Sequence, residues 1–156
     1  MRILVTGGAG YIGSVVTAEL LKAGHEVIVF DNLSRGHRSA LPEAATLIVG
    51  DVADRESLNL LFKSQRIDAV MHFAALIEVA ESMKVPELYY RNNSAGTLTL
   101  LEAMLAAGVT KFVFSSTAAV YGMPEAGVCQ EETPTAPINP YGSSKLMSEW
   151  MLRDLS

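Results

Sequence analysis

Arg2-Ile3-Leu4-Val5-Thr6 runs directly into Gly7-Gly8-Ala9-Gly10-Tyr11-Ile12-Gly13, and this stretch decides the fold class of the 156-residue chain. The first five residues have the length and apolar character of a buried strand. Apolar side chains then recur at helical spacing over residues 11–23, and Gly24 ends that pattern. A strand, a glycine-rich turn and a helix in this order are the first unit of a parallel sheet with crossover helices.

The same alternation continues along the chain. Further strands are expected at residues 26–30, 46–50, 68–73 and 111–116. Further helices are expected after Asp54, over residues 86–107 and over residues 141–155. Because the crossovers are long enough to hold helices and are right-handed, few topologies remain. The sequence predicts an α/β fold, a Rossmann-like doubly wound parallel sheet of strand order 3-2-1-4-5 with helices on both faces.

Local signals refine this pattern. Asp54 is expected to be the N-cap of a helix that buries Leu58, Leu61 and Phe62. The polar residues 32–42 are expected to form a loop. Residues 122–140 hold four of the six prolines and are expected to be irregular.

The glycines after the first strand predict a nucleotide site. Glycines at positions 7, 10 and 13 allow a tight turn, a close approach of a pyrophosphate and close packing of helix on strand. The start of the following helix would face the phosphates with unpaired N–H groups and the positive end of its dipole. A glycine-rich turn without a ligand is the alternative, but the strand before and the helix after are the context that the motif requires.

Asp31 ends the second predicted strand, 18 residues after Gly13. A carboxylate at about this distance accepts hydrogen bonds from the adenosine ribose and would repel the 2′-phosphate of NADP. Arg35 lies close by and could receive that phosphate, which weakens the preference without reversing it. Alternatively, Asp31 caps a turn with Asn32. Both signals together predict a dinucleotide site that prefers NAD.

Two further groups carry hydroxyls or a charge suited to proton transfer. Tyr141 and Lys145 lie four residues apart after Pro140, so they share one face of the last predicted helix. A nearby ammonium favours the phenolate form of a tyrosine, which is the form that acts as a base. Ser115-Ser116-Thr117 follows the fifth strand, at the sheet edge where ligands bind. Chance spacing for the Tyr–Lys pair and a helix cap for the hydroxyls are the alternatives.

Composition excludes several classes of protein. Hydrophobic residues make up 49%, charged residues 19% and the net charge is −5, which excludes a disordered chain and a general attraction to nucleic acid or anionic membranes. No apolar run approaches the ~18 residues of a membrane span, and the apolar stretch after Met1 is too short for a signal peptide. His25, His37 and His72 have no metal-ligand spacing. Cys129 is the single cysteine, which is compatible with a reducing cytoplasm.

Taken together, these motifs resemble the extended short-chain dehydrogenase/reductase family over the whole chain. The resemblance is carried by Thr6-Gly7-Gly8-Ala9-Gly10-Tyr11-Ile12-Gly13, Asp31-Asn32, Gly50-Asp51-Val52, His72-Phe73-Ala74-Ala75, Ser115-Ser116-Thr117 and the Tyr141/Lys145 pair. The branch that epimerises nucleotide sugars is indicated by Asp31-Asn32-Leu33-Ser34-Arg35-Gly36 and by Tyr90-Arg91-Asn92-Asn93 followed by Gly96-Thr97.

The resemblance implies a role for each matching position. NAD would be held at the pyrophosphate by Gly7, Gly10, Tyr11, Ile12 and Gly13, at the adenosine ribose by Asp31 and Asn32, and at the adenine by Asp51 and Val52. Phe73, Ala74 and Ala75 would line the cofactor, with Asn93 and Ser115 near it. Thr117, Tyr141 and Lys145 would be catalytic, with Thr117 and Tyr141 touching the sugar and Lys145 on the nicotinamide ribose.

The implied activity is NAD-dependent epimerisation of a UDP-sugar at C4 through a 4-keto intermediate. Residues 1–156 would be the NAD-binding domain, and the substrate domain of the family would be absent from this chain. A homodimer through the helices 86–107 and 141–155 is also implied. Ile77 stands where some members have a lysine that contacts the cofactor.

Two other activities remain open. One is another nucleotide-sugar dehydratase/reductase of the family. Related dehydratases or decarboxylases place acidic residues just after the strand-five hydroxyl, where this chain has Ala118 and Ala119. A cofactor-binding module without turnover is the other alternative, because the substrate half of the family is missing.

Overall fold

The computed structural model describes residues 1–124 and 127–156. The chain divides into two compact units, and each is described by itself. The sheet unit contains Met1–Ala75 and Thr99–Ser115, and the helical unit contains Leu76–Leu98 and Ser116–Ser156.

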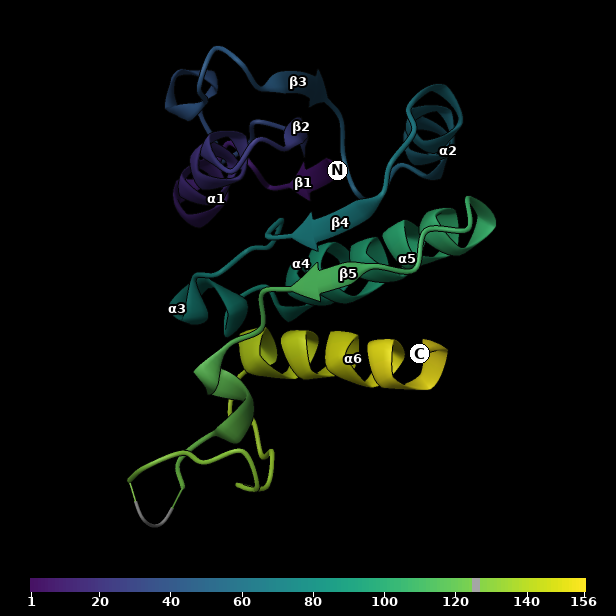
Figure 1. Cartoon of the computed structure of the whole chain (residues 1–156). Coiled ribbons are helices and arrows are strands. Elements are labelled where there is room, and N and C mark those ends of the chain that lie inside the picture. Colours follow the sequence, from purple (N-terminus) through teal and green to yellow (C-terminus); the bar gives the residue numbers. More distant parts are fainter. Residues whose placement is uncertain (125–126) are drawn as a thin grey trace. The chain divides into compact units, whose positions relative to one another are not determined.

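The sheet unit is built on five parallel strands (Figure 1). They are β1 (Arg2–Thr6), β2 (Glu26–Asp31), β3 (Thr46–Val49), β4 (Ala69–His72) and β5 (Phe112–Phe114). Their order, β3-β2-β1-β4-β5, confirms the predicted fold class and topology. The chain builds outward from β1 to β3 and then returns to place β4 on the other side of β1. The carboxyl edge between β1 and β4 is therefore the switch point at which such sheets bind ligands.

Helices connect these strands. They are α1 (Tyr11–Lys22), the short 3-10 turn η1 (Arg38–Ala40), α2 (Arg55–Ser64) and α5 (Gly96–Ala106), of which Thr99 onward belongs to this unit. Asp54 caps α2 as expected, because its carboxylate accepts hydrogen bonds from the N–H groups of Glu56 and Ser57 at 3.0 and 3.2 Å. Leu58 and Leu61 are buried, whereas Phe62 is only half-buried.

Successive side chains of a strand point to opposite faces of the sheet, and both faces are apolar. Ile3 and Val5 of β1 form one cluster with Val27 and Val29 of β2, against which Leu20 and Leu21 of α1 pack. The residues between them point to the opposite face, because successive strand residues alternate. Leu4, Ile28 and Val70 are buried there. A sheet covered on both faces requires these near-continuous apolar strands.

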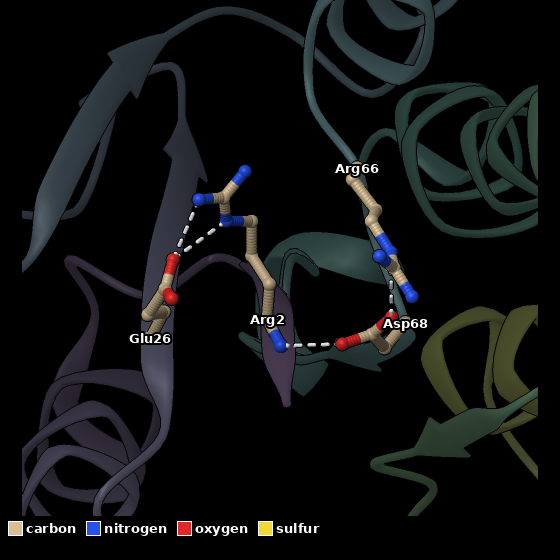
Figure 2. A network of polar contacts seen from close by, with 4 residues as sticks. All are labelled: Arg2, Glu26, Arg66 and Asp68. Carbon is tan, nitrogen blue, oxygen red and sulfur yellow. Dashed lines mark hydrogen bonds and ion pairs between the residues drawn. The ribbon is translucent and has the colours of Figure 1, made fainter.

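Polar contacts join three strands at the opposite, amino edge of the sheet (Figure 2). The backbone N–H of Arg2 donates to Asp68 Oδ2 at 2.8 Å, and the Arg2 guanidinium pairs with Glu26 at 2.6 Å. Arg66 Nε lies 3.6 Å from Asp68 Oδ1. The hydrogen bond from the Arg2 N–H, together with the positive charges of Arg66, the N-terminus and Lys111, holds the pKa of Asp68 below its usual value. This network lies where β1, β2 and β4 begin.

The helical unit contains α3 (Val79–Ser82), α4 (Pro86–Tyr89), a π-helical segment (Tyr90–Ala95), the start of α5, the 3-10 turn η3 (Ala118–Tyr121) and α6 (Pro140–Leu155). One α-helix over residues 86–107 was expected, but its middle is π-helical. The carbonyl of Asn93 accepts hydrogen bonds from the hydroxyls of Thr97 at 2.5 Å and Ser148 at 3.2 Å. These side-chain donors favour the wider turn at this point.

The segment before α6 is irregular over its described residues, as expected. Residues 122–140 form no helix or strand before Pro140 over their described part, and residues 125–126 of that stretch lie outside the described residues. Across the described part of the chain, no helix has the length and apolar character needed to cross a membrane.

Candidate functional site

The turn between β1 and α1 leaves no room for side chains at two of its glycines. Gly7 has a φ of 70°, and a Cβ there would lie 2.4 Å from the backbone N of Ala74 at the end of β4. A Cβ on Gly13 would lie 2.2 Å from the carbonyl O of Gly7. Gly10 differs, because its Cβ would meet only that carbonyl, at 3.3 Å. Gly7 and Gly13 are thus needed for packing, whereas Gly10 is less crowded and has one close contact.

The start of α1 is well suited to an anion. Its N-cap is Gly10, which has no side chain to accept from the first N–H groups, and its first turn holds no acid. Tyr11 is 89% exposed and Ile12 is more than half exposed, so their side chains do not close the approach. The unpaired N–H groups and the positive end of the helix dipole are the features by which proteins hold a pyrophosphate. The residues present therefore fit the phosphate groups of a dinucleotide.

Asp31, the last residue of β2, ties this turn to the next strand. It is 8% exposed, and its Oδ2 accepts from the N–H of Ala9 at 3.0 Å. Its Oδ1 accepts from the N–H of Leu33 at 2.8 Å, which is the turn-capping role considered as the alternative. A carboxylate has about four acceptor positions, so both bonds leave capacity for ribose hydroxyls. Asp31 is held in place by the glycine turn itself.

Asn32 and Asp51 come together at the same carboxyl edge. Asn32 Nδ2 donates to Asp51 Oδ2 at 2.8 Å, and Asp51 Oδ1 accepts from the N–H of Ala53 at 2.8 Å. Val52, the next residue, is buried. The structure thus gathers the predicted ribose and adenine residues of β2 and β3 into one connected group.

The ends of β4 and β5 complete this edge of the sheet unit. Phe73, Ala74, Ala75 and Ser115 are half-buried there. His72 is 1% exposed, its Nδ1 is hydrogen-bonded to Thr6 Oγ1 at 2.5 Å, and its ring stacks on Phe114 with centroids 5.8 Å apart. His72 is a packed core residue at the end of β4.

In the helical unit, Tyr141 and Lys145 lie on the first turns of α6. Asn139 Oδ1 accepts from the N–H of Gly142 at 2.8 Å, and Pro140 is the first helical residue, so this end of the helix is firmly defined. Lys145 is only 3% exposed. Burial lowers its pKa to about 8, and the carboxylate of Glu149 acts in the opposite direction.

Thr117 immediately precedes η3. Its Oγ1 accepts from the N–H of Ala119 at 3.2 Å, so the capping role considered as the alternative is present, and the hydroxyl hydrogen is not used in that bond. Gly142 brings this turn against α6, because a Cβ on Gly142 would lie 2.6 Å from the carbonyl O of Ala119. The backbones of Gly142, which follows Tyr141, and Ala119, two residues after Thr117, are therefore in contact.

The Gly142→Ala substitution tests this contact. Alanine is favoured over glycine inside helices by about 1 kcal/mol, so propensity alone would stabilise the variant. Overlap with the Ala119 carbonyl is expected to outweigh that gain and to lower the free energy of unfolding by about 1–3 kcal/mol. Thermal unfolding followed by circular dichroism measures the change, with Ser143→Ala as the neighbouring control. An unchanged or raised melting temperature for Gly142→Ala would contradict the packing.

A second tyrosine, which sequence reasoning missed, lies beside Tyr141. The ring of Tyr89 meets that of Tyr141 edge-on, with centroids 6.4 Å apart at 82°. Its hydroxyl donates to the Glu78 carbonyl at 2.7 Å and to Glu81 Oε2 at 2.8 Å. Burial, together with the Glu81 carboxylate, raises the pKa of Tyr89 to about 12. The hydroxyl of Tyr89 is therefore engaged by protein groups and stays in its neutral form.

Asn93 is 2% exposed, and its amide is occupied by protein groups. Its Oδ1 accepts from the N–H of Leu76 at 2.9 Å, and its Nδ2 donates to the carbonyl of Leu76 at 2.9 Å and to Ser144 Oγ at 3.0 Å. Leu76 directly follows Ala75 in the chain. Asn93 therefore fixes the segment that leaves the predicted cofactor-lining residues.

Metal ligation finds no support in these side chains. Among the described residues, no group of three or more histidine, cysteine, aspartate or glutamate side chains is placed to hold a metal ion.

Comparison with known proteins shows what the chain as a whole is similar to. A family profile described as "NAD dependent epimerase/dehydratase family" matches residues 3–156. The UDP-glucose 4-epimerase of Azospirillum brasilense is 57% identical over 153 residues, which are 98% of this chain and 44% of that protein. The chain thus spans about half the length of the curated relatives it matches.

Solved structures of UDP-sugar 4-epimerases superpose closely on this chain. The UDP-Glc/GlcNAc 4-epimerase of Campylobacter jejuni superposes with a TM-score of 0.96 at 50% identity, covering 99% of this chain and 49% of that one. The UDP-glucose 4-epimerase of Bifidobacterium longum, in complex with NAD⁺ and UDP, gives 0.95 at 42% identity, with the same two coverages.

Proposed function

Because this chain belongs to the NAD dependent epimerase/dehydratase family, we propose that residues 1–156 form the NAD-binding domain of an enzyme that epimerises a UDP-sugar at C4. The UDP-glucose/UDP-galactose pair is the proposed substrate, in line with the names of its relatives. The substrate-binding domain is proposed to correspond to the part of those relatives that this chain does not span.

One observation carries the cofactor assignment. The start of α1 has Gly10 as an N-cap without a side-chain hydrogen bond, and the carboxylate of Asp31 accepts from the N–H of Ala9 in the same turn. This arrangement supports a dinucleotide site, which requires an anion site and a ribose acceptor close together. Asn32, Asp51 and Val52 would continue this site toward the adenine.

The helical unit would supply the proton transfers. Tyr141 would take the proton from the sugar 4-hydroxyl, and Thr117 would hydrogen-bond the same oxygen. Lys145, one helical turn from Tyr141, would favour the phenolate and hold the nicotinamide ribose. The chemistry that bound NAD supplies is reversible hydride acceptance, which epimerisation through a 4-keto sugar requires. Tyr141 would return the proton when the sugar is reduced on its other face.

Two alternatives can be weighed against the structure. A dehydratase would need an acid in the turn after Thr117, and that turn begins with Ala118 and Ala119, which cannot transfer a proton. A cofactor-binding module without turnover would keep the contacts of the sheet unit and leave Tyr141 unused.

NAD is expected to bind at least about tenfold more tightly than NADP, a difference of roughly 1.4 kcal/mol. The reason is the negative charge of Asp31, which would face the 2′-phosphate. Calorimetric titration of the chain with each dinucleotide measures the ratio. Asp31→Ala should reduce the ratio of NAD to NADP affinity. Asp31→Asn removes the charge but keeps an oxygen that can accept from the Ala9 N–H, so it separates the loss of charge from the loss of that bond. Asp154→Asn, on the exposed end of α6, is the control. Tighter binding of NADP would overturn the cofactor choice and point to Arg35.

For assembly we propose a homodimer through the helical segment 86–107 and α6. Both present apolar side chains to solvent that a second copy would cover, namely Leu98, Leu105, Met147, Trp150 and Leu155. Long helices with such faces commonly pair across a two-fold axis.

The proposed location is the cytoplasm. Cys129, the single cysteine, is an exposed free thiol. Free thiols persist in a reducing compartment, which supports this choice.

A further inference from the structure

Glu149 lies on the same helix face as the two proposed catalytic residues of α6. It follows Lys145 by four residues, and Lys145 follows Tyr141 by four. Residues at this spacing are neighbours on a helix surface, with about 5–6 Å between their Cβ atoms. Glu149 Oε1 also accepts a hydrogen bond from Ser116 Oγ. The carboxylate is therefore also held by Ser116, from the segment that precedes η3.

Lys145 requires such a neighbour because it is buried. The adjacent small residues of its helix, Ser144 and Ser148, are also buried, so little water reaches its ammonium. Burial lowers the pKa of Lys145 to about 8, and Glu149 works against that shift. The remaining titratable side chains on the elements packed against α6 are Glu81, Glu87, Tyr89, Tyr90, Arg91 and Tyr121.

Two of those groups already have defined states. Tyr89 is neutral, and its hydroxyl donates to the Glu81 carboxylate. The Glu81 carboxylate is thus engaged by the Tyr89 hydroxyl. Glu149, by contrast, lies on the same helix as Lys145. Glu149 is the acid best placed to act on Lys145.

We propose that Glu149, oriented by Ser116, is a positioning residue that keeps the buried side chain of Lys145 in its ammonium form. The use of that ammonium, beside Tyr141 and toward the nicotinamide ribose, rests on the proposed function. The coupling between Glu149 and Lys145 is a property of the chain without any ligand.

The contribution of Glu149 matters because the pKa of Lys145 lies close to neutral pH. An amine with a pKa of about 8 is still mostly protonated at pH 7. An opposite charge at close range shifts a pKa by about one to three units. Without Glu149 the pKa of Lys145 would be lower, and a larger share of the molecules would carry an uncharged amine.

NMR titration of the 156-residue chain, with its lysines labelled with ¹³C, tests this coupling directly. The sequence contains five lysines, and the Lys145→Arg variant identifies the signal of Lys145 by its loss. In Glu149→Gln, which keeps the shape and an acceptor for Ser116, the pKa of Lys145 is expected to fall by about one unit or more. In Glu149→Asp, which keeps the negative charge, the pKa of Lys145 should lie close to that of the unaltered chain. Ser116→Ala should lower this pKa by less than Glu149→Gln does. Glu87→Gln, an exposed charge change in the same unit, should leave the value unchanged.

An unchanged pKa of Lys145 in Glu149→Gln would overturn the proposal, as would an equal shift in Glu87→Gln. A purely structural Glu149 would give that unchanged value, because glutamine preserves the packing and the hydrogen bond. The titration contains no cofactor, so the result is independent of the proposed function. Failure of the unaltered chain to bind NAD would contradict that function and leave the Glu149–Lys145 result standing.

Discussion

Replacing Tyr141 by phenylalanine is expected to lower the rate of UDP-sugar epimerisation by about 10²–10⁴-fold, the usual contribution of a general base. The measurement requires a substrate-binding part, so the chain is joined after residue 156 to the C-terminal part of the Azospirillum brasilense relative. The substitution removes only the phenol oxygen. The ring keeps its edge-on contact with Tyr89, and the cap of α6 at Asn139 is untouched.

Two controls separate chemistry from folding in this experiment. NAD affinity should change little in Tyr141→Phe, because the glycine turn and Asp31 remain. Tyr89→Phe removes a neighbouring hydroxyl that is hydrogen-bonded to Glu81 and neutral, so it should retain far more activity. Activity of Tyr141→Phe within about tenfold of the unaltered chimera, roughly 1.4 kcal/mol in barrier, would exclude Tyr141 as the principal base.

The order of the strands was predictable because it depends on short-range signals. Apolar runs mark the strands, crossover lengths require parallel pairing, and handedness removes most topologies. Gly7 and Gly13 were predictable as well, since the backbone crowding at these two positions accompanies the strand–turn–helix sequence around them. Asp31 was assigned either to a turn cap or to a ribose, and the structure shows the cap and a bond to the glycine turn.

The interior of the helical unit could not be predicted, because its contacts join residues far apart in sequence. In the π-helical segment, the carbonyl of Asn93 accepts from the hydroxyl of Ser148, 55 residues later. Glu81 of α3 accepts a hydrogen bond from the buried Tyr89 of α4. The bond from Ser116 to Glu149 spans 33 residues. Neither helical period nor motif spacing carries information about such pairs, so only the folded chain shows how Tyr141 and Lys145 are supported.

By itself, the 156-residue chain is expected to bind NAD and to show no measurable epimerisation of UDP-glucose or UDP-galactose. The glycine turn, Asp31, Asn32 and Asp51 are all present and joined to one another. The chain nevertheless covers only 44% of the Azospirillum brasilense relative. Calorimetry with NAD and an epimerisation assay on the same sample measure the two properties, and the chimera is the positive control for turnover.

The physical reason lies in how binding energy is used. Contacts to the uridine and diphosphate, far from the reacting carbon, normally position the sugar and lower the barrier of the chemical step. Loss of that positioning can forfeit about 7 kcal/mol or more, roughly five orders of magnitude in rate. Tyr141, Thr117 and Lys145 can therefore be correctly folded and still have no sugar held against them. Robust turnover by the 156-residue chain would overturn this expectation, and it would mean that the substrate site is built from these residues alone or from two copies of them.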